Sequence, residues 1–230
     1  MKNCSGLILV ILLFLYGCNA QEITKKSQVG GIDISHYQES EIDFLLPIKD
    51  SLEFIIMKAT EGNSVDPKFH HNWQKAKEIG FIRGAYHLFI AKDKPIDQLN
   101  NYLNTVPDFS HDNLPPIVDI ENCNNIELVH FEMKLLTFLQ GIEDSTGRTP
   151  IIYTNLSTGN NCFSDTSFSK YPIWIAQYTT ADQPELPTLW SESDWLFWQK
   201  SKTYSIGDYT NDFDVYNGNL IELKKYIKEN

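Results

Sequence analysis

Alternating strand and helix patterns are the feature that most narrows what this chain can fold into. Short runs rich in β-branched and aromatic residues occur at 30–37, 53–60, 81–89, 115–121 and 149–155. Helical spacing of apolar residues occurs between them at 66–80, 95–106 and 126–144. Strand, helix and strand in repetition predict parallel strands joined by crossover helices.

The pattern changes after residue 155. Three more strand candidates follow at 172–178, 194–200 and 211–218, joined by links rich in Pro, Ser, Asp and Thr with no helical period. A last amphipathic piece, 219–229, is typical of a short terminal helix. Eight strands in one domain of this size predict an α/β fold, a closed barrel that lacks helices in its last third.

Composition limits the class of protein. The chain has 230 residues, 42% of them hydrophobic, which suits one sizeable globular domain. Its formal net charge of −11 argues against a nucleic-acid partner, because such a partner requires a basic patch.

The N-terminus has the pattern of an export signal. Residues 1–17 hold one Lys and an apolar stretch from Leu7 to Tyr16, which is too short to span a bilayer. The segment Leu15-Tyr16-Gly17-Cys18 resembles a bacterial lipobox, so we expect a lipid anchor on Cys18 and a polar tether over 18–29. We therefore expect a membrane-anchored lipoprotein of a bacterial cell envelope, with a plain secreted protein as the alternative.

Two cysteines remain beyond the signal, Cys123 and Cys162. In an oxidising compartment two such cysteines often form a disulfide, and two free thiols are the alternative. No close Cys or His accompanies either one, so we expect no metal site.

Acidic residues stand at predicted strand ends. Asp33 ends the first strand, Asp119 and Glu121 end the fourth, and Asp214 lies on the eighth. In a barrel of parallel strands the chemistry collects at the carboxyl ends, and alternation places Asp119 and Glu121 on one strand face. Clustered and partly buried carboxyl groups raise one another's pKa, which gives a protonated acid beside ionised ones. Glycosidic bond cleavage uses such a set.

Aromatic residues at or near strand ends support a sugar-binding interpretation. Tyr86, Tyr153, Trp174 and Tyr178 could hold pyranose rings against their faces and bond hydroxyls with their polar edges. The alternative for each one alone is core packing. A carboxylate cluster could also hold a divalent cation, but the strand-end positions fit hydrolysis without a metal or other cofactor.

Seven short segments occur along the chain in a fixed order: GIDISHYQ, FIIMKATEG, RGAYHLF, PPIVDIE, GRTPIIYTN, PIWIAQY and DFDVYNG. With these segments in this order, the chain resembles the glycoside hydrolase family 25 lysozymes, the Chalaropsis type. The resemblance covers about residues 30–218, so we expect a catalytic domain over 30–230. It implies an incomplete TIM-like barrel, with five β/α units followed by three strands. It also implies muramidase activity on peptidoglycan glycan strands. We expect the protein to be a monomer.

Carried over by position, the resemblance makes Glu121 the general acid and Asp119 its partner, acting as nucleophile or orienting the substrate's acetamido group. Asp33 and Asp214 match the two other acids of the site. The four aromatic residues match groove positions, and Gln199 is also expected to line the groove. The chain departs from the family where Asn217 comes three residues after Asp214 instead of two. A polar insertion at 156–170 is expected to carry Cys162 toward Cys123 and brace one rim of the groove.

Two other functions stay open at this stage. A lipid-anchored glycan-binding protein without catalysis would keep the aromatic residues and lose an acid, whereas all four acids are present. A chitinase-like glycosidase would carry the run DxxDxDxE, but Leu114 and Ile117 stand at its first two acidic positions.

Overall fold

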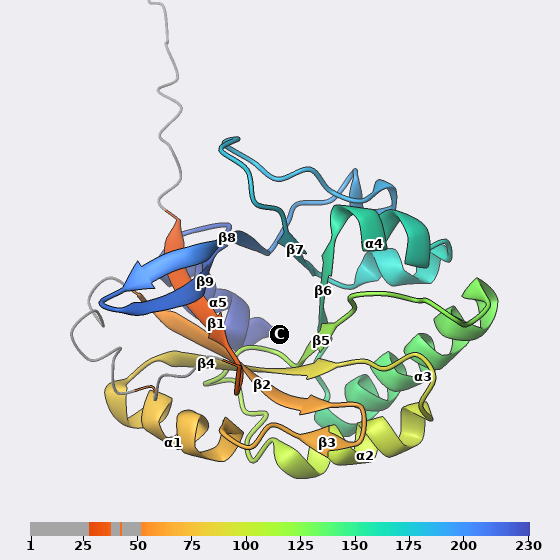
Figure 1. Cartoon of the computed structure of the whole chain (residues 1–230), viewed down its shortest axis with the longest axis horizontal. Helices are drawn as coiled ribbons and strands as arrows, with labels where there is room; N and C mark the ends of the chain where they lie inside the picture. Colours follow the sequence, from red (N-terminus) through yellow and green to blue (C-terminus); the bar gives the residue numbers. More distant parts are fainter. Residues whose placement is uncertain (1–27, 38–41, 43–51) are drawn as a thin grey trace, which may run out of the picture.

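Eight strands close into a barrel in the computed structural model, which describes residues 28–37, 42 and 52–230 (Figure 1). The barrel strands are β1 (Val29–Ile34), β2 (Phe54–Glu61), β4 (Ile82–Leu88), β5 (Ile117–Asp119), β6 (Ile151–Asn155), β7 (Ile173–Ala176), β8 (Phe197–Ile206) and β9 (Tyr209–Tyr216). Their order is β1-β9-β8-β7-β6-β5-β4-β2, and pairing of β1 with β2 closes the ring. A two-residue strand, β3 (Ser64–Val65), pairs with the end of β2. The predicted barrel is therefore confirmed.

The last strand runs against the others. All pairs from β1 through β2, β4, β5, β6 and β7 to β8 are parallel, whereas β9 is antiparallel to both β8 and β1. The prediction that Asp214 lies at the carboxyl end of a parallel strand is therefore wrong. Asp214 pairs with Gly31 of β1 on one side and with Gln199 of β8 on the other, within the hydrogen-bonded part of the sheet.

Helices cover the outside of the barrel where the sequence predicts them. They are α1 (Phe69–Ile79), α2 (Pro95–Thr105) and α3 (Leu128–Thr146). Gly80 and Gly147 end α1 and α3 with φ of 91° and 68°, a left-handed conformation that glycine adopts without steric cost.

The polar insertion after β6 contains short helical segments, and the first of them completes the fifth β/α unit. It forms α4 (Leu156–Cys162) and the 3₁₀ helix η2 (Thr166–Lys170), and a second 3₁₀ helix, η3 (Thr188–Trp190), precedes β8. The Asn155 side chain accepts a hydrogen bond from the main-chain N–H of Thr158 and so caps α4.

Apolar side chains pack in two layers, as expected for a barrel wrapped by helices. One layer fills the space between the strands and the outer helices, and the other fills the barrel. Gly31 makes room for the inner layer, because a Cβ there would lie 2.3 Å from a ring carbon of Phe54. The inner layer is formed by Val29, Phe54, Ile56, Leu114, Ile117, Ile151, Trp174, Phe197, Tyr216, Leu223 and Ile227.

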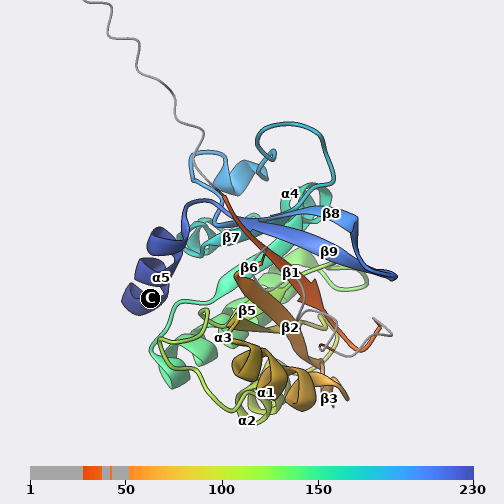
Figure 2. The same ribbon diagram turned by 90° about the vertical axis from the view of Figure 1, so that its left-hand side faces the viewer.

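The terminal helix α5 (Leu220–Glu229) closes the floor of the barrel. It lies at the opposite end from the tip of the β8–β9 hairpin (Figure 2). Arg148 ties this floor together, because its buried guanidinium donates to main-chain carbonyl oxygens on two segments far apart in sequence. These acceptors are Phe109, Ser110, Asn113, Leu114, Ile227 and Asn230.

Candidate active site

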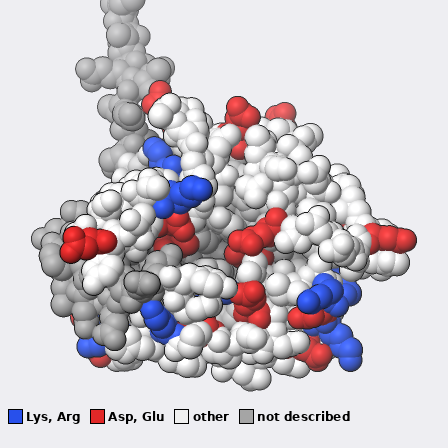
Figure 3. Space-filling view, viewed as in Figure 1, with Lys and Arg blue, Asp and Glu red and all other residues white. Residues whose placement is uncertain are grey.

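A cavity of about 190 Å³ opens at the carboxyl ends of the parallel strands. Figure 3 shows acidic side chains around a hollow near the centre of this face. Eight of the nine predicted catalytic and substrate-binding residues line the cavity, together with one residue that was not predicted from the sequence. The lining residues are Asp33, Tyr86, Asp119, Glu121, Tyr153, Trp174, Tyr178, Gln199 and Asp212.

Asp119 and Glu121 reach the cavity from the end of β5, but their surroundings differ. Asp119 is the last residue of the strand and is buried, whereas Glu121 is exposed on the rim. Burial raises the pKa of Asp119 well above its usual value, and the charges of Glu121 and Asp33 raise it further. One carboxyl oxygen of Asp119 has no hydrogen-bond partner among the described residues.

Asp33 is held by a hydrogen-bonded group of side chains centred on Gln199. The Gln199 Nε2 donates to Asp33 Oδ2 at 2.6 Å, while its Oε1 accepts from the hydroxyls of Tyr153 at 2.9 Å and Tyr178 at 2.8 Å. Burial, followed by the charge of Asp212, raises the pKa of Asp33 to about 7. Gln199 thus connects β8 to three other strand ends and orients an acid.

The acids of β9 require a correction to the prediction. Asp214 is fully buried below the cavity and does not line it, and its Oδ1 accepts a 2.9 Å hydrogen bond from Trp174 Nε1. Asp212, two residues earlier, is the acid that lines the cavity. Because β9 is antiparallel to its neighbours, residues nearer the cavity mouth come earlier in its sequence. Burial raises the pKa of Asp212, and burial followed by the charge of Asp33 raises the pKa of Asp214 well above its usual value.

The aromatic residues of the cavity differ in exposure and in their contacts. Trp174 and Tyr153 pack edge to face, with ring centroids 4.5 Å apart, and the Trp174 indole is already bonded to Asp214. Tyr178 is 51% exposed, so its side chain is accessible to a ligand. Burial raises the pKa of Tyr86 and Tyr153 well above the usual value, so both hydroxyls remain protonated donors at neutral pH.

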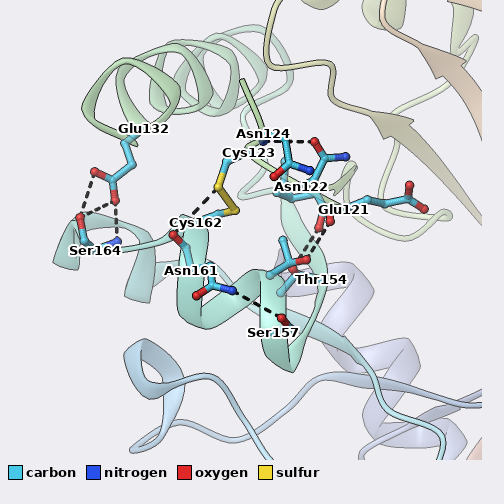
Figure 4. The surroundings of a disulfide bond; sticks show 12 residues. Glu121, Asn122, Cys123, Asn124, Glu132, Thr154, Ser157, Asn161, Cys162 and Ser164 are labelled. Carbon is cyan, nitrogen blue, oxygen red and sulfur yellow. Dashed lines mark hydrogen bonds between the residues drawn. A yellow bond between two sulfur atoms is a disulfide. The ribbon is translucent and has the colours of Figure 1, made fainter. Parts of the chain in front are cut away.

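A disulfide joins the segment after β5 to α4. The sulfur atoms of Cys123 and Cys162 are 2.09 Å apart, and the Glu121 side chain points away from them (Figure 4). The Thr158 hydroxyl donates to the main-chain carbonyl oxygen of Glu121 at 2.7 Å, and the Thr154 hydroxyl donates to that of Ile120 at 3.0 Å. Three contacts from the β6–α4 unit therefore fix the main chain that carries Glu121.

Other predictions concern the N-terminus, the membrane and metal ions. The export signal and Cys18 fall outside the described residues, and the anchor and the monomeric state stay predictions. Across 28–37, 42 and 52–230, no helix combines the length and apolar character needed to cross a bilayer. Within the same ranges, no group of three or more His, Cys, Asp or Glu side chains is placed to hold a metal ion.

The arrangement has the groups that glycosidic bond cleavage uses. An exposed carboxyl group, Glu121, faces a cavity lined by the buried Asp33 and Asp119 and the half-buried Asp212. Burial raises the pKa of these three acids, so protonated and ionised forms can coexist among them. Tyrosine hydroxyls and the exposed Tyr178 side chain can bind a polar ring with apolar faces.

Comparison with known proteins agrees with this chemistry. The model of glycosyl hydrolases family 25 matches residues 32–209. The chain is 33% identical to the protein YegX of Escherichia coli K12 over 207 residues, covering 86% of this chain and 73% of YegX. It is 31% identical to lysozyme M1 of Streptomyces globisporus, covering 86% of this chain and 70% of that protein. The crystal structure of a lysozyme from Streptomyces coelicolor superposes with a TM-score of 0.80 at 28% identity, covering 88% of this chain and 98% of that one.

Proposed function

The chain belongs to glycosyl hydrolase family 25, and we propose that it is a muramidase. Its reaction is hydrolysis of the β-1,4 bond between N-acetylmuramic acid and N-acetylglucosamine in peptidoglycan. The observation that carries the proposal is the convergence of Asp33, Asp119 and Glu121 around one cavity, from strands far apart in sequence. The similarity to lysozyme M1 supports the same substrate.

Glu121 is the general acid in this proposal. It is exposed and lines the cavity, so its carboxyl group can reach the glycosidic oxygen of a glycan bound there. The proton passes to the oxygen of the leaving sugar as the glycosidic bond breaks.

Asp119 is the partner carboxyl group. Its burial favours the neutral form, but an N–H donor from the substrate's acetamido group could satisfy the oxygen that lacks a partner among the described residues. A hydrogen bond to the charged form lowers a pKa, so this contact favours ionised Asp119 as positive charge develops at the anomeric carbon.

The proposal predicts that Glu121→Gln removes muropeptide release from purified peptidoglycan. General acid catalysis contributes about 10²- to 10⁴-fold, so we expect a loss in that range with an unchanged melting temperature, since Glu121 is exposed. The matched control is Glu127→Gln, an exposed carboxyl group at the start of α3. Release of muropeptides within about tenfold of the parent rate would contradict the role of Glu121.

Mass spectrometry of the products distinguishes the alternatives. A new reducing end on N-acetylmuramic acid supports the muramidase, whereas a reducing end on N-acetylglucosamine or turnover of chitin alone contradicts it. Binding of peptidoglycan without any loss of turbidity supports the non-catalytic alternative.

A further inference from the structure

A second cavity lies beside the active site and begins at the residue after Glu121. Its volume is about 220 Å³, and we call it the asparagine cavity. One wall is the segment after β4, and the other is the segment after β5. The lining residues are Phe89, Ile90, Ala91 and Lys92 on the first wall and Asn122, Asn124 and Asn125 on the second.

The first wall is held from behind by two side chains. The carboxamide of Gln98 accepts from the main-chain N–H of Ile90 at 2.8 Å and donates to its carbonyl oxygen at 3.1 Å. Lys134 Nζ donates to the carbonyl oxygens of Ala91 at 2.8 Å, Lys92 at 3.3 Å and Asp93 at 3.2 Å. These contacts fix the main chain of the wall and leave the exposed Lys92 side chain facing solvent.

The second wall is fixed by the disulfide at Cys123. Asn122 Oδ1 also accepts from the main-chain N–H of Asn124 at 3.3 Å (Figure 4). Asn125 adopts a left-handed conformation with φ of 63°, which asparagine tolerates better than most residues. Both walls are therefore ordered before a ligand arrives, which reduces the entropy cost of binding.

The lining chemistry suits a short peptide that carries a carboxylate. Carboxamides donate and accept at once, which matches the N–H and C=O groups of a peptide main chain. Lys92 supplies a positive charge for a carboxylate, and Phe89, Ile90 and Ala91 supply apolar surface for small side chains. In peptidoglycan, a short peptide with carboxylate groups hangs from the lactyl ether of the muramic acid.

We propose that the asparagine cavity binds the peptide stem of the muramic acid whose glycosidic bond lies at Glu121. The inference rests on the proposed function, because it needs a glycan in the neighbouring cavity. Asn122 follows Glu121 directly, so a sugar at the acids and its peptide branch can occupy the two cavities together. The enzyme then cleaves peptide-bearing glycan in preference to bare glycan.

The test compares two glycan substrates from one peptidoglycan preparation, one with its stems and one stripped by an N-acetylmuramoyl amidase. We expect the parent enzyme to show a higher kcat/KM on the stem-bearing glycan. Lys92→Ala should lower that kcat/KM about 1.5-fold to fivefold, the range for one exposed charged contact, and leave the value on stripped glycan unchanged. Lys92→Ala combined with Asn124→Ala should lower it about tenfold.

Lys94→Ala is the matched control, since Lys94 is an exposed lysine two residues away that does not line the cavity. It should leave both values unchanged. Equal kcat/KM on the two substrates for the parent, or equal losses on both for the variants, would overturn the stem-binding role while leaving the muramidase intact. Failure of the parent to cleave either substrate would overturn the proposed function itself and the inference with it.

Discussion

At the scale of single residues, the two carboxyl groups of β9 differ in what surrounds them. Asp212 lines the cavity, whereas Asp214 is fully buried between Trp174 and Asp33. Two carboxyl groups can bond to each other only if one keeps its proton, and burial raises the pKa of Asp214 well above its usual value. A neutral Asp214 can thus accept from Trp174 and donate to Asp33.

Asp214→Asn tests this description. An asparagine is neutral and has an oxygen to accept from Trp174 and an N–H to donate to Asp33, so we expect activity within about threefold of the parent. Asp214→Leu leaves the buried Trp174 N–H without a partner, so we expect it to lose at least about tenfold in activity and about 1–3 kcal/mol in stability. The rate of turbidity loss of cell walls and the melting temperature measure both variants. An asparagine variant as inactive as the leucine variant would show that a negative charge is needed at this position.

Most residues of this site are predictable from the sequence, but which of them line the cavity and which are buried beneath it is less so. Alternation along β5 places Asp119 and Glu121 on one face, and the structure brings both to the cavity. Asp212 was missed because the direction of β9 decides which of its acids is nearest the mouth. A signal was present in Gly207-Asp208, which stands between two strand-like runs and forms the turn of an antiparallel hairpin, with φ of 59° at Gly207.

At the scale of elements, α4 supports the segment that carries the general acid of the proposal. Its Thr158 bonds the main chain of Glu121, and its Cys162 is linked to Cys123 across 39 positions of sequence. A loop of that length corresponds to about 4 kcal/mol of stabilisation in the chain-entropy model. Glu132 of α3 holds the segment that follows α4. Its carboxylate accepts from the main-chain N–H of Asp165 at 2.9 Å and from the hydroxyl of Ser164 at 2.9 Å.

Thr158→Val tests whether α4 positions Glu121. The substitution keeps the size and removes the hydroxyl that donates at 2.7 Å, so we expect kcat to fall about tenfold with KM nearly unchanged and stability to fall by about 1 kcal/mol. Thr158→Ser keeps the donor and should restore kcat. A valine variant with parental kcat, or a serine variant as slow as the valine variant, would show that the hydroxyl does not act through Glu121.

Helix α4 could not be predicted from apolar periodicity, because it has only seven residues. Three of them, Thr158, Gly159 and Cys162, are buried, and none of these has a large apolar side chain. Longer elements were predictable: α3 has 19 residues and repeats its buried face several times, so the predicted range 126–144 lies within two residues of the observed one.

At the scale of the whole molecule, the buried acids make stability depend on pH. Burial raises the pKa of Asp33 to about 7 and raises the pKa of Asp119 and Asp214 well above the usual value. Above about pH 4 the unfolded chain loses these protons while the native protein keeps them, so the free energy of unfolding falls as pH rises. His87 opposes this trend, because burial lowers its pKa to about 4, so its contribution rises between about pH 4 and 6.5.

The three carboxyl groups with raised pKa values change the free energy of unfolding more than the single histidine does. We therefore expect the melting temperature to be higher at pH 5 than at pH 8. Calorimetry across that range measures the trend, and Asp214→Asn should reduce its slope because it removes one titrating group. A melting temperature that rises from pH 5 to pH 8 would contradict the protonated state of the cluster.

The closed floor of the barrel has a practical consequence for handling the enzyme. Arg148 holds the carbonyl oxygen of Asn230 on the side where α5 lies, opposite the tip of the β8–β9 hairpin (Figure 2). An enzyme immobilised through its last residue should therefore turn its catalytic face away from the solid support and toward a suspension of cell walls. Random coupling through lysines would also use Lys92 and Lys202, which lie beside the asparagine cavity and the Tyr178 ring, and should obstruct the approach of a glycan strand.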